Sequence, residues 1–352
     1  RWTRSRGNPM KNKSNTIKWI LLGVGAIVLL VFPLVAPNRY TVHIVNMAGI
    51  WILMSLGLNL AMGYCGQINL ALGAFWGVGA YTAALLNTRF GSPIWINMPL
   101  GMILAGITGA LIALPMLKVR SHYLALVTIG LAETINIIMV NEIWLTEGPL
   151  GISAIEMPEL FGIPIDGAER FFYLVLFFVV IGFLVARQIV NHRIGRAFIA
   201  IRDDDTAARA MGVNVARYQV LANALAGVYC GVAGVLYAHM STYISPDIFE
   251  FKNALFVLTM TMVGGMGSLA GSLVGGLALP LTQEWLRAIK HWQLVGFGLA
   301  IMIVVLFMPG GVVGLTRKIE EAGGIRLPWA RKQPERKTVA EEKLEMEGPN
   351  VA

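Results

Sequence analysis

Charged side chains are scarce in this sequence of 352 residues. Asp, Glu, Lys and Arg make up only 14% of it, whereas average soluble domains carry about 25%. Hydrophobic residues account for 56%, and the mean hydropathy is +0.65. Several apolar runs reach or approach the roughly 20 residues that a helix needs to cross a bilayer. The composition excludes an ordinary soluble domain and predicts a polytopic helical membrane protein.

Cysteines and catalytic motifs are also lacking. The two cysteines, Cys65 and Cys230, lie in or beside apolar runs, so they form neither a disulfide framework nor a metal-binding spacing. The sequence contains no H-E-x-x-H motif, no nucleophile elbow and no pair of intramembrane aspartates, and its five histidines are scattered. A Walker A sequence is absent, so this chain cannot power itself with ATP. We expect no catalytic residue, cofactor or metal site in this chain.

About ten apolar segments are predicted to form an all-α polytopic membrane bundle, with one broken or re-entrant segment. They cover residues 17–36, 42–62, 73 to about 86, 94–117, 123–140, 171–190, 220–240, 254–269, 271–285 and 292–308. A signal peptide is the alternative for the first segment, but its apolar run exceeds the usual length of roughly 7–15 residues. We divide the chain into a basic segment (1–16), a membrane domain (17–315) and a charged tail (316–352).

An even number of spans puts both ends of the chain on one side of the membrane, and the basic residues indicate which side. With both termini inside, most Lys and Arg residues are also inside, and the outside carries Arg39, Arg89, Arg170, Lys252, Arg287 and Lys290. This bias agrees with the positive-inside rule. Residues 141–169 contain six acidic residues and no Lys or Arg, so we place them outside. We attribute the net charge of +8 to this sidedness rather than to nucleic-acid binding.

A second polar interruption, residues 191–217, is predicted to face the cytoplasm. Asp203, Asp204 and Asp205 can cap the start of a helix and suit the positive end of its dipole. Gly212 is a good residue for the position just after the end of that helix. The helix would be only about two turns long, and isolated helices below roughly 12–15 residues are marginal in water. It is therefore either a helix that docks into another protein or an ordinary capped turn between two spans.

Small side chains dominate this short helix, which would let a partner approach its backbone closely. The residues that we expect at such a contact are Asp205, Thr206, Ala207, Ala208, Ala210, Met211 and Gly212.

Several polar side chains are predicted to lie at membrane depth. Residues 63–73 are rich in glycine and include Gln67 and Asn69, which suggests a segment without regular helix. Non-helical backbone is tolerated at that depth only where it is buried in protein or lines a cavity. As candidates for lining a translocation path we take Asn59, Gln67, Asn69, Glu133 and Asn136.

Glu133 can be weighed by its insertion energy. A carboxylate at the centre of a membrane helix costs about 2.5–3.5 kcal/mol, whereas each Leu, Ile or Val contributes about 0.3–0.6 kcal/mol in favour. Nine such residues between positions 124 and 140 contribute roughly 4 kcal/mol on that scale. The span is near break-even and needs neighbours. Glu133 is therefore either a residue of the path or a partner in a hydrogen bond between helices.

Glycines four residues apart indicate where helices pack closely, because small residues let backbones meet in lipid. The glycines expected at helix contacts are Gly73, Gly77, Gly264, Gly267, Gly271 and Gly275. The run 263–276 contains too many glycines for one plain helix, so a break or tight bend is predicted at 264–267. Close packing without any functional role is the alternative for most of these glycines. Residues 66–73 and 265–272 resemble each other weakly, as equivalent parts of two halves would.

Four stretches together resemble a known family: 66–81 (GQINLALGAFWGVGAY), 146–152 (TEGPLGI), 202–214 (RDDDTAARAMGVN) and 263–271 (VGGMGSLAG). The body of the chain, from about 17 to 315, is similar to the permease subunits of branched-chain amino acid ABC importers, of the LivM type. The third stretch is the most specific of the four. The charged tail after Leu315 is longer than this resemblance leads us to expect.

The resemblance implies that residues 191–217 form a coupling loop whose short helix seats in an ATPase subunit. It also implies a second, related permease, two ABC ATPases that hold ATP and magnesium, and an extracytoplasmic amino-acid-binding protein. The location would be the cytoplasmic (inner) membrane of a bacterium, with lipid around the bundle. The expected cargo is leucine, isoleucine or valine. Two alternatives stay open: a urea or short-amide permease of the same superfamily, and a stand-alone channel or secondary transporter.

Overall fold

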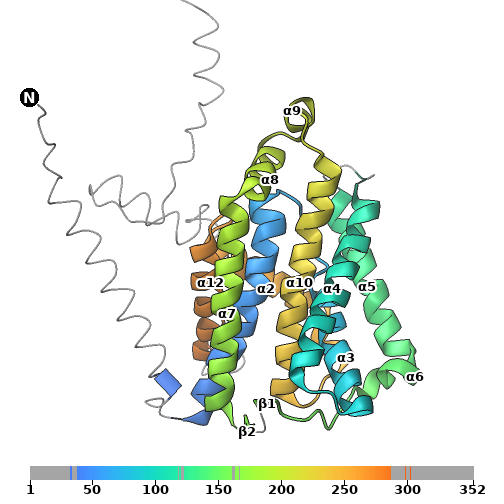
Figure 1. The fold of residues 1–352 in the computed structure, drawn as a ribbon, viewed down its shortest axis with the longest axis vertical. Coiled ribbons are helices and arrows are strands. Elements are labelled where there is room, and N and C mark those ends of the chain that lie inside the picture. Colours follow the sequence, from blue (N-terminus) through green and yellow to red (C-terminus); the bar gives the residue numbers. More distant parts are fainter. Residues whose placement is uncertain are drawn as a thin grey trace, which may run out of the picture. The chain divides into compact units, whose positions relative to one another are not determined.

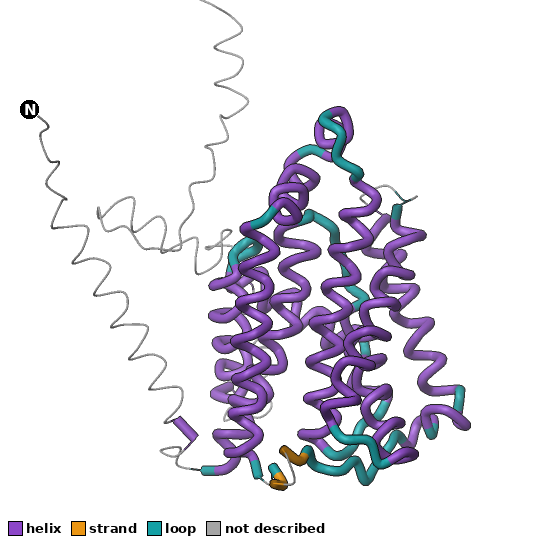
Figure 2. The backbone as a smooth tube through the Cα atoms, in the orientation of Figure 1, coloured by secondary structure: helices purple, strands orange, loops and turns teal. Residues whose placement is uncertain are grey.

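The computed structural model describes residues 38–286, except 118, 120–122, 161–162 and 166, together with residues 32, 33, 298 and 302. Helices make up most of this part (Figures 1 and 2). The elements are α2 (Arg39–Leu58), the π-helical η1 (Asn59–Tyr64), α3 (Leu72–Phe90), α4 (Ile94–Met116), α5 (Leu124–Asn141), α6 (Ile143–Thr146), η3 (Gly148–Leu150), β1 (Glu159–Leu160), β2 (Ile163–Pro164), α7 (Ala168–Asn191), α8 (Arg193–Asp203), α9 (Asp205–Ala210), α10 (Val215–Ser241), η4 (Pro246–Phe249), α11 (Phe251–Gly264) and α12 (Leu269–Leu286). The strands β1 and β2 pair antiparallel.

In the described part, five helical segments are long and apolar enough to cross a membrane: Arg39–Tyr64, α4, α5, α7 and α10. The predicted helical membrane bundle is therefore confirmed. The predicted total of about ten spans stays a prediction, because the segments at 17–36 and 292–308 lie outside the described residues, apart from four isolated positions. The basic segment at 1–16 and the tail at 316–352 lie outside them as well.

α10 lies at the centre of the bundle, between α2 and the pair α3 and α4 (Figure 1). Its glycines allow this position. A Cβ atom on Gly231 would lie 2.7 Å from the carbonyl oxygen of Gly101 on α4, and one on Gly79 of α3 would lie 2.6 Å from the Cα atom of Gly231. The three backbones therefore meet where only glycine fits.

The core beside α10 is aromatic. The ring of Trp76 on α3 packs against Trp51 of α2, Tyr237 of α10 and Phe249 of η4, with ring centroids 4.9–5.2 Å apart. Edge-to-face and tilted arrangements of this kind are favourable. Trp76 thus ties α2 and α3 to α10 and η4, which lie in a later part of the chain.

The short helix α9 lies at one end of the bundle, and α6, β1 and β2 lie at the other (Figure 1). We call these the α9 end and the hairpin end. The acidic residues 141–169 and the polar residues 191–217 are thus at opposite ends, as the charge pattern requires.

Two interruptions break the helices of the bundle. The first comprises the π-helical η1, which continues α2, and residues 65–71, which form no helix before α3 begins. The second is the turn between α11 and α12, where Gly265 (φ +118°) and Gly267 (φ +76°) adopt conformations that other residues rarely take. Both breaks were predicted, at 63–73 and 264–267. α11 has 14 residues and is about 21 Å long, less than the roughly 30 Å of a bilayer core.

Candidate functional site

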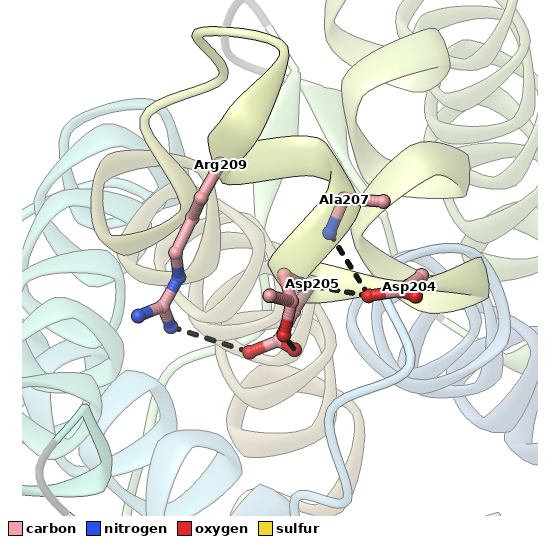
Figure 3. A network of polar contacts seen from close by, with 5 residues as sticks. Asp204, Asp205, Ala207 and Arg209 are labelled. Atoms are coloured by element: carbon pink, nitrogen blue, oxygen red, sulfur yellow. Dashed lines mark hydrogen bonds and ion pairs between the residues drawn. The ribbon is translucent and has the colours of Figure 1, made fainter.

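The short helix α9 is capped at its start by Asp204. The Asp204 carboxylate accepts hydrogen bonds from the backbone N–H groups of Thr206 (2.8 Å) and Ala207 (3.0 Å), as Figure 3 shows for Ala207. Of the three aspartates in the sequence, the middle one is therefore the cap. Asp205 and Arg209, one turn apart, form an exposed ion pair at 3.2 Å (Figure 3).

The end of α9 is closed by Gly212. This residue has φ +82°, and its N–H donates to the Arg209 carbonyl. The N–H of Val213 donates to the Ala208 carbonyl at 3.0 Å. These two bonds form a Schellman motif, in which glycine occupies the left-handed position. The position predicted for Gly212 is confirmed. Six helical residues thus hold their shape because both ends are satisfied locally.

The side chains of α9 divide into an exposed face and one inward contact. Asp205, Thr206, Ala207, Ala210, Met211 and Gly212 are exposed, and Met211 has 84% of its surface accessible. Ala208 is only 4% exposed. Its side chain packs within this chain, so the structure does not place it on the surface that a partner would touch. A two-turn helix has too few apolar residues for the sequence to reveal this orientation.

A groove of about 520 Å³ lies beside α9, between α8 and the start of α10. Three of its lining residues are arginines: Arg193, Arg196 and Arg217. Gly212 and Met211 form part of the same lining, so the groove continues the exposed face of α9. The surface offered to a partner is therefore basic and partly apolar.

A cluster of buried amides lies inside the bundle. Asn223 of α10 donates to the Gln67 side chain and accepts from the Asn69 side chain, both at 2.5 Å. Thr128 of α5 accepts a hydrogen bond from the backbone N–H of Leu70 at 3.3 Å. Gln67, Asn69, Asn223 and Thr128 are each 4% exposed or less. The bonds fix the non-helical residues 65–71 against two neighbouring helices, because buried polar groups must find partners.

The structure brings Gln67 and Asn69 together but places the other three candidates elsewhere. Asn59 clamps the turn between α11 and α12: it accepts from the Gly267 N–H and donates to the Ser268 carbonyl, both at 2.8 Å. Glu133 is exposed on α5. Asn136, half-buried, donates to the Pro246 carbonyl at 3.3 Å.

The glycines expected at helix contacts are mostly found at close approaches. Gly264 and Gly271 face each other where α11 meets α12, and a Cβ on Gly271 would lie 2.6 Å from the Gly264 oxygen. Gly275 meets the same part of α11. Gly73 and Gly77 of α3 pack against residue Phe249. Gly267 differs, because it serves the turn rather than a helix contact.

Two members of the amide cluster were missed by the sequence analysis. Asn223 is an isolated amide within the apolar run 220–240, a signal that could have been used. Thr128 gives no such signal, because a threonine in a helix commonly bonds within its own helix, and Thr128 also donates to the Ala125 carbonyl.

Comparisons with known proteins show which family this chain belongs to. Residues 40–308 match the family described as "Branched-chain amino acid transport system / permease component". The high-affinity branched-chain amino acid transport system permease protein LivM of Escherichia coli (strain K12) is 32% identical over 326 residues, covering 86% of this chain and 77% of that protein. The chain belongs to this permease family. The predicted family resemblance is confirmed.

More distant relatives include permease proteins named LivM and LivH. A probable LivM of Methanocaldococcus jannaschii is 23% identical, covering 75% of this chain and 90% of that protein. LivH of Escherichia coli (strain K12) is 25% identical, covering 77% of this chain and 93% of that protein. No solved structure matches the chain. Family membership makes it a transport subunit of the membrane. Within the part that the structure describes, no group of three or more His, Cys, Asp or Glu residues could hold a metal ion.

Proposed function

We propose that this permease is one of two related membrane subunits of an ATP-driven importer for branched-chain amino acids. The relatives are named as high-affinity permeases for that substrate class, which supports the choice of cargo. The observation that carries the proposal is α9, a helix capped at both ends that presents an exposed face at the end of the bundle.

α9 and the adjoining groove form the proposed ATPase-docking surface. Its contact residues are Asp205, Thr206, Ala207, Ala210, Met211 and Gly212, and Ala208 supports the helix from beneath. The arginines of the groove favour acidic side chains on the ATPase. Because exposed pairs contribute little affinity, they would mainly orient the partner and speed its association. The α9 end would then face the cytoplasm, and the hairpin end would receive the binding protein.

The outward face of α5 is the proposed wall of the translocation path. Glu133 is exposed there, and among the described residues no Lys or Arg pairs with it. A carboxylate left in lipid at the helix centre costs about 2.5–3.5 kcal/mol. The α5 face is therefore more stable in contact with water or with the second permease than in contact with lipid. The path would then run between the two permease subunits. Gln67 and Asn69 belong to the non-helical segment 65–71, which is bonded to α5 through the Leu70 N–H and Thr128.

Uptake by the reconstituted complex tests the proposal. Vesicles containing both permeases and the ATPases, supplied with the binding protein, should accumulate radiolabelled leucine only when ATP is present. Unlabelled isoleucine or valine should compete for uptake, and urea should not. Uptake of urea without leucine would replace the cargo, and uptake without ATP or ATPases would make the chain a channel or secondary transporter.

A further inference from the structure

Arg202, in the last turn of α8, touches both interruptions of the bundle. Its guanidinium Nη1 donates to the Gly63 carbonyl at 3.0 Å, at the end of η1. A Cβ atom on Gly66 would lie 2.9 Å from the Arg202 Cγ, and one on Gly267 would lie 3.1 Å from the Arg202 Nη1. Arg202 therefore lies between the first break and the turn that joins α11 to α12.

The contact with Gly63 satisfies a helix end. The last carbonyls of a helix have no partner within it, and a cation near them is favourable. η1 is also wound with π-type bonds, and such segments occur frequently at functional sites. The Arg202 guanidinium thus caps the carbonyl end of η1, where the winding departs from that of an α-helix.

Arg202 is also close to α9 in the sequence. It forms an ion pair with Asp203 at 3.3 Å, and the next residue, Asp204, is the cap of α9. α8 contacts η1, the segment that continues α2. Only Asp203 and Asp204 separate Arg202 from the first residue of α9. A displacement of α9 would therefore move Arg202 directly.

Beyond Arg202 the contacts lead into the bundle along two routes. Gly63 and Gly66 precede Gln67 and Asn69, whose amides bond to Asn223. The Gly267 N–H donates to Asn59, which joins the second break to η1. Both breaks contain glycine, which has more backbone freedom than other residues, and discrete rearrangements of helix-breaking segments are one way in which motion passes between sites.

We propose that Arg202 is a positioning residue that transmits movement of α9 to both helix breaks and so to the buried amide cluster. The proposal rests on the proposed function, because a docked ATPase must supply the movement. A purely structural arginine would hold the fold without changing how the breaks respond to nucleotide, so the response to nucleotide separates the two roles.

Cys65 is a built-in reporter of the first break. It directly precedes Gly66 and is 2% exposed, and the chain's other cysteine, Cys230, is fully buried. In a Cys230→Ala background, the purified complex is treated with N-ethylmaleimide, with and without a non-hydrolysable ATP analogue. When Arg202 is unchanged in this background, the analogue should raise the labelling rate of Cys65 by exposing its thiol. This readout needs no transported substrate, so it is independent of the leucine experiment.

Arg202→Gln should keep the ATPases bound but reduce the nucleotide-dependent rise in labelling about tenfold, the change that loss of one charge-assisted hydrogen bond makes in an equilibrium. Arg202→Lys, which can still donate to the Gly63 carbonyl, should retain part of the rise. Arg187→Gln, an exposed arginine on α7, is the matched control and should behave as wild type.

Three results would overturn the inference. The first is a normal nucleotide response in Arg202→Gln. The second is loss of the ATPases from that variant, which would make Arg202 part of the docking surface only. The third is a wild-type complex that binds ATPases and imports leucine but shows no nucleotide-dependent labelling, which would leave the proposed function intact.

Discussion

At the scale of single residues, Asn223 links the amides of Gln67 and Asn69 across a distance of more than 150 residues in sequence. The sequence placed Gln67 and Asn69 at membrane depth from their glycine-rich surroundings. It could not pair them with Asn223, because a lone amide in an apolar helix indicates that a partner exists but not which one. Asn59 was also predicted at membrane depth, but its partners are backbone atoms of the second break and the Ser272 hydroxyl.

Replacing Asn223 by leucine should destabilise the bundle, because Gln67 and Asn69 would each lose a buried partner. Each unsatisfied amide costs about 1–3 kcal/mol, so the variant should unfold at a lower temperature in detergent and transport poorly. Asn141→Leu is the control, because its amide is exposed and bonds within its own helix. Equal melting temperatures for the two variants would show that the cluster is not a structural tie.

Glu133→Gln keeps the shape of the side chain and removes its charge. If the α5 face lines the path, this variant should assemble with its partners and show reduced uptake, because the polar wall would lose its charge. Uptake of labelled substrate and co-purification of the second permease are the two measurements. If both are unchanged, the charge has no role and Glu133 should be removed from the path.

At the scale of elements, glycine decides both where helices break and where they meet. The breaks at 63–73 and 264–267 could be predicted, because runs of glycine are incompatible with a plain helix. The close approach of α3, α4 and α10 was not predicted, because the glycines expected at helix contacts did not include Gly79 of α3 or Gly101 of α4. Their partners on α10 follow from the packing alone. The orientation of Ala208 could not be predicted either, because a two-turn helix has too few apolar residues to indicate which of its faces is buried.

Gly231→Val should damage this junction. A Cβ at position 231 would lie 2.7 Å from a backbone oxygen of α4, which cannot rotate away. Overpacking of this kind costs about 1–3 kcal/mol or more, so the isolated permease should melt at a lower temperature. Gly130→Val on α5 is the matched control, since no atom lies within 4 Å of its Cβ position. A junction variant as stable as the control would contradict the packing.

At the scale of the whole molecule, α9 and the hairpin lie at opposite ends of the bundle (Figure 1), and the charge bias predicts that the α9 end faces the cytoplasm. Single cysteines introduced at Glu156 and Asn214, both exposed, should report this sidedness in a Cys65→Ala, Cys230→Ala background. In intact cells, an impermeant maleimide should label position 156 and not position 214. The opposite pattern would invert the topology and remove α9 from the ATPase side.

The central claim is that α9 holds the ATPase, and Ala207→Glu tests it most directly. Ala207 is exposed at the third position of α9, where glutamate favours the start of a helix. The variant should therefore leave α9 and the bundle intact while burying an unpaired charge in the contact. A loss of about 3 kcal/mol weakens association roughly a hundredfold. Ser153→Glu, exposed at the hairpin end, is the control.

Co-purification of the ATPase subunits with each variant is the measurement. The proposed docking predicts that Ala207→Glu inserts normally and loses its ATPases together with leucine uptake, whereas Ser153→Glu keeps its ATPases. Normal ATPase binding and normal uptake by Ala207→Glu would contradict the claim and leave α9 as a capped turn on the surface of the bundle.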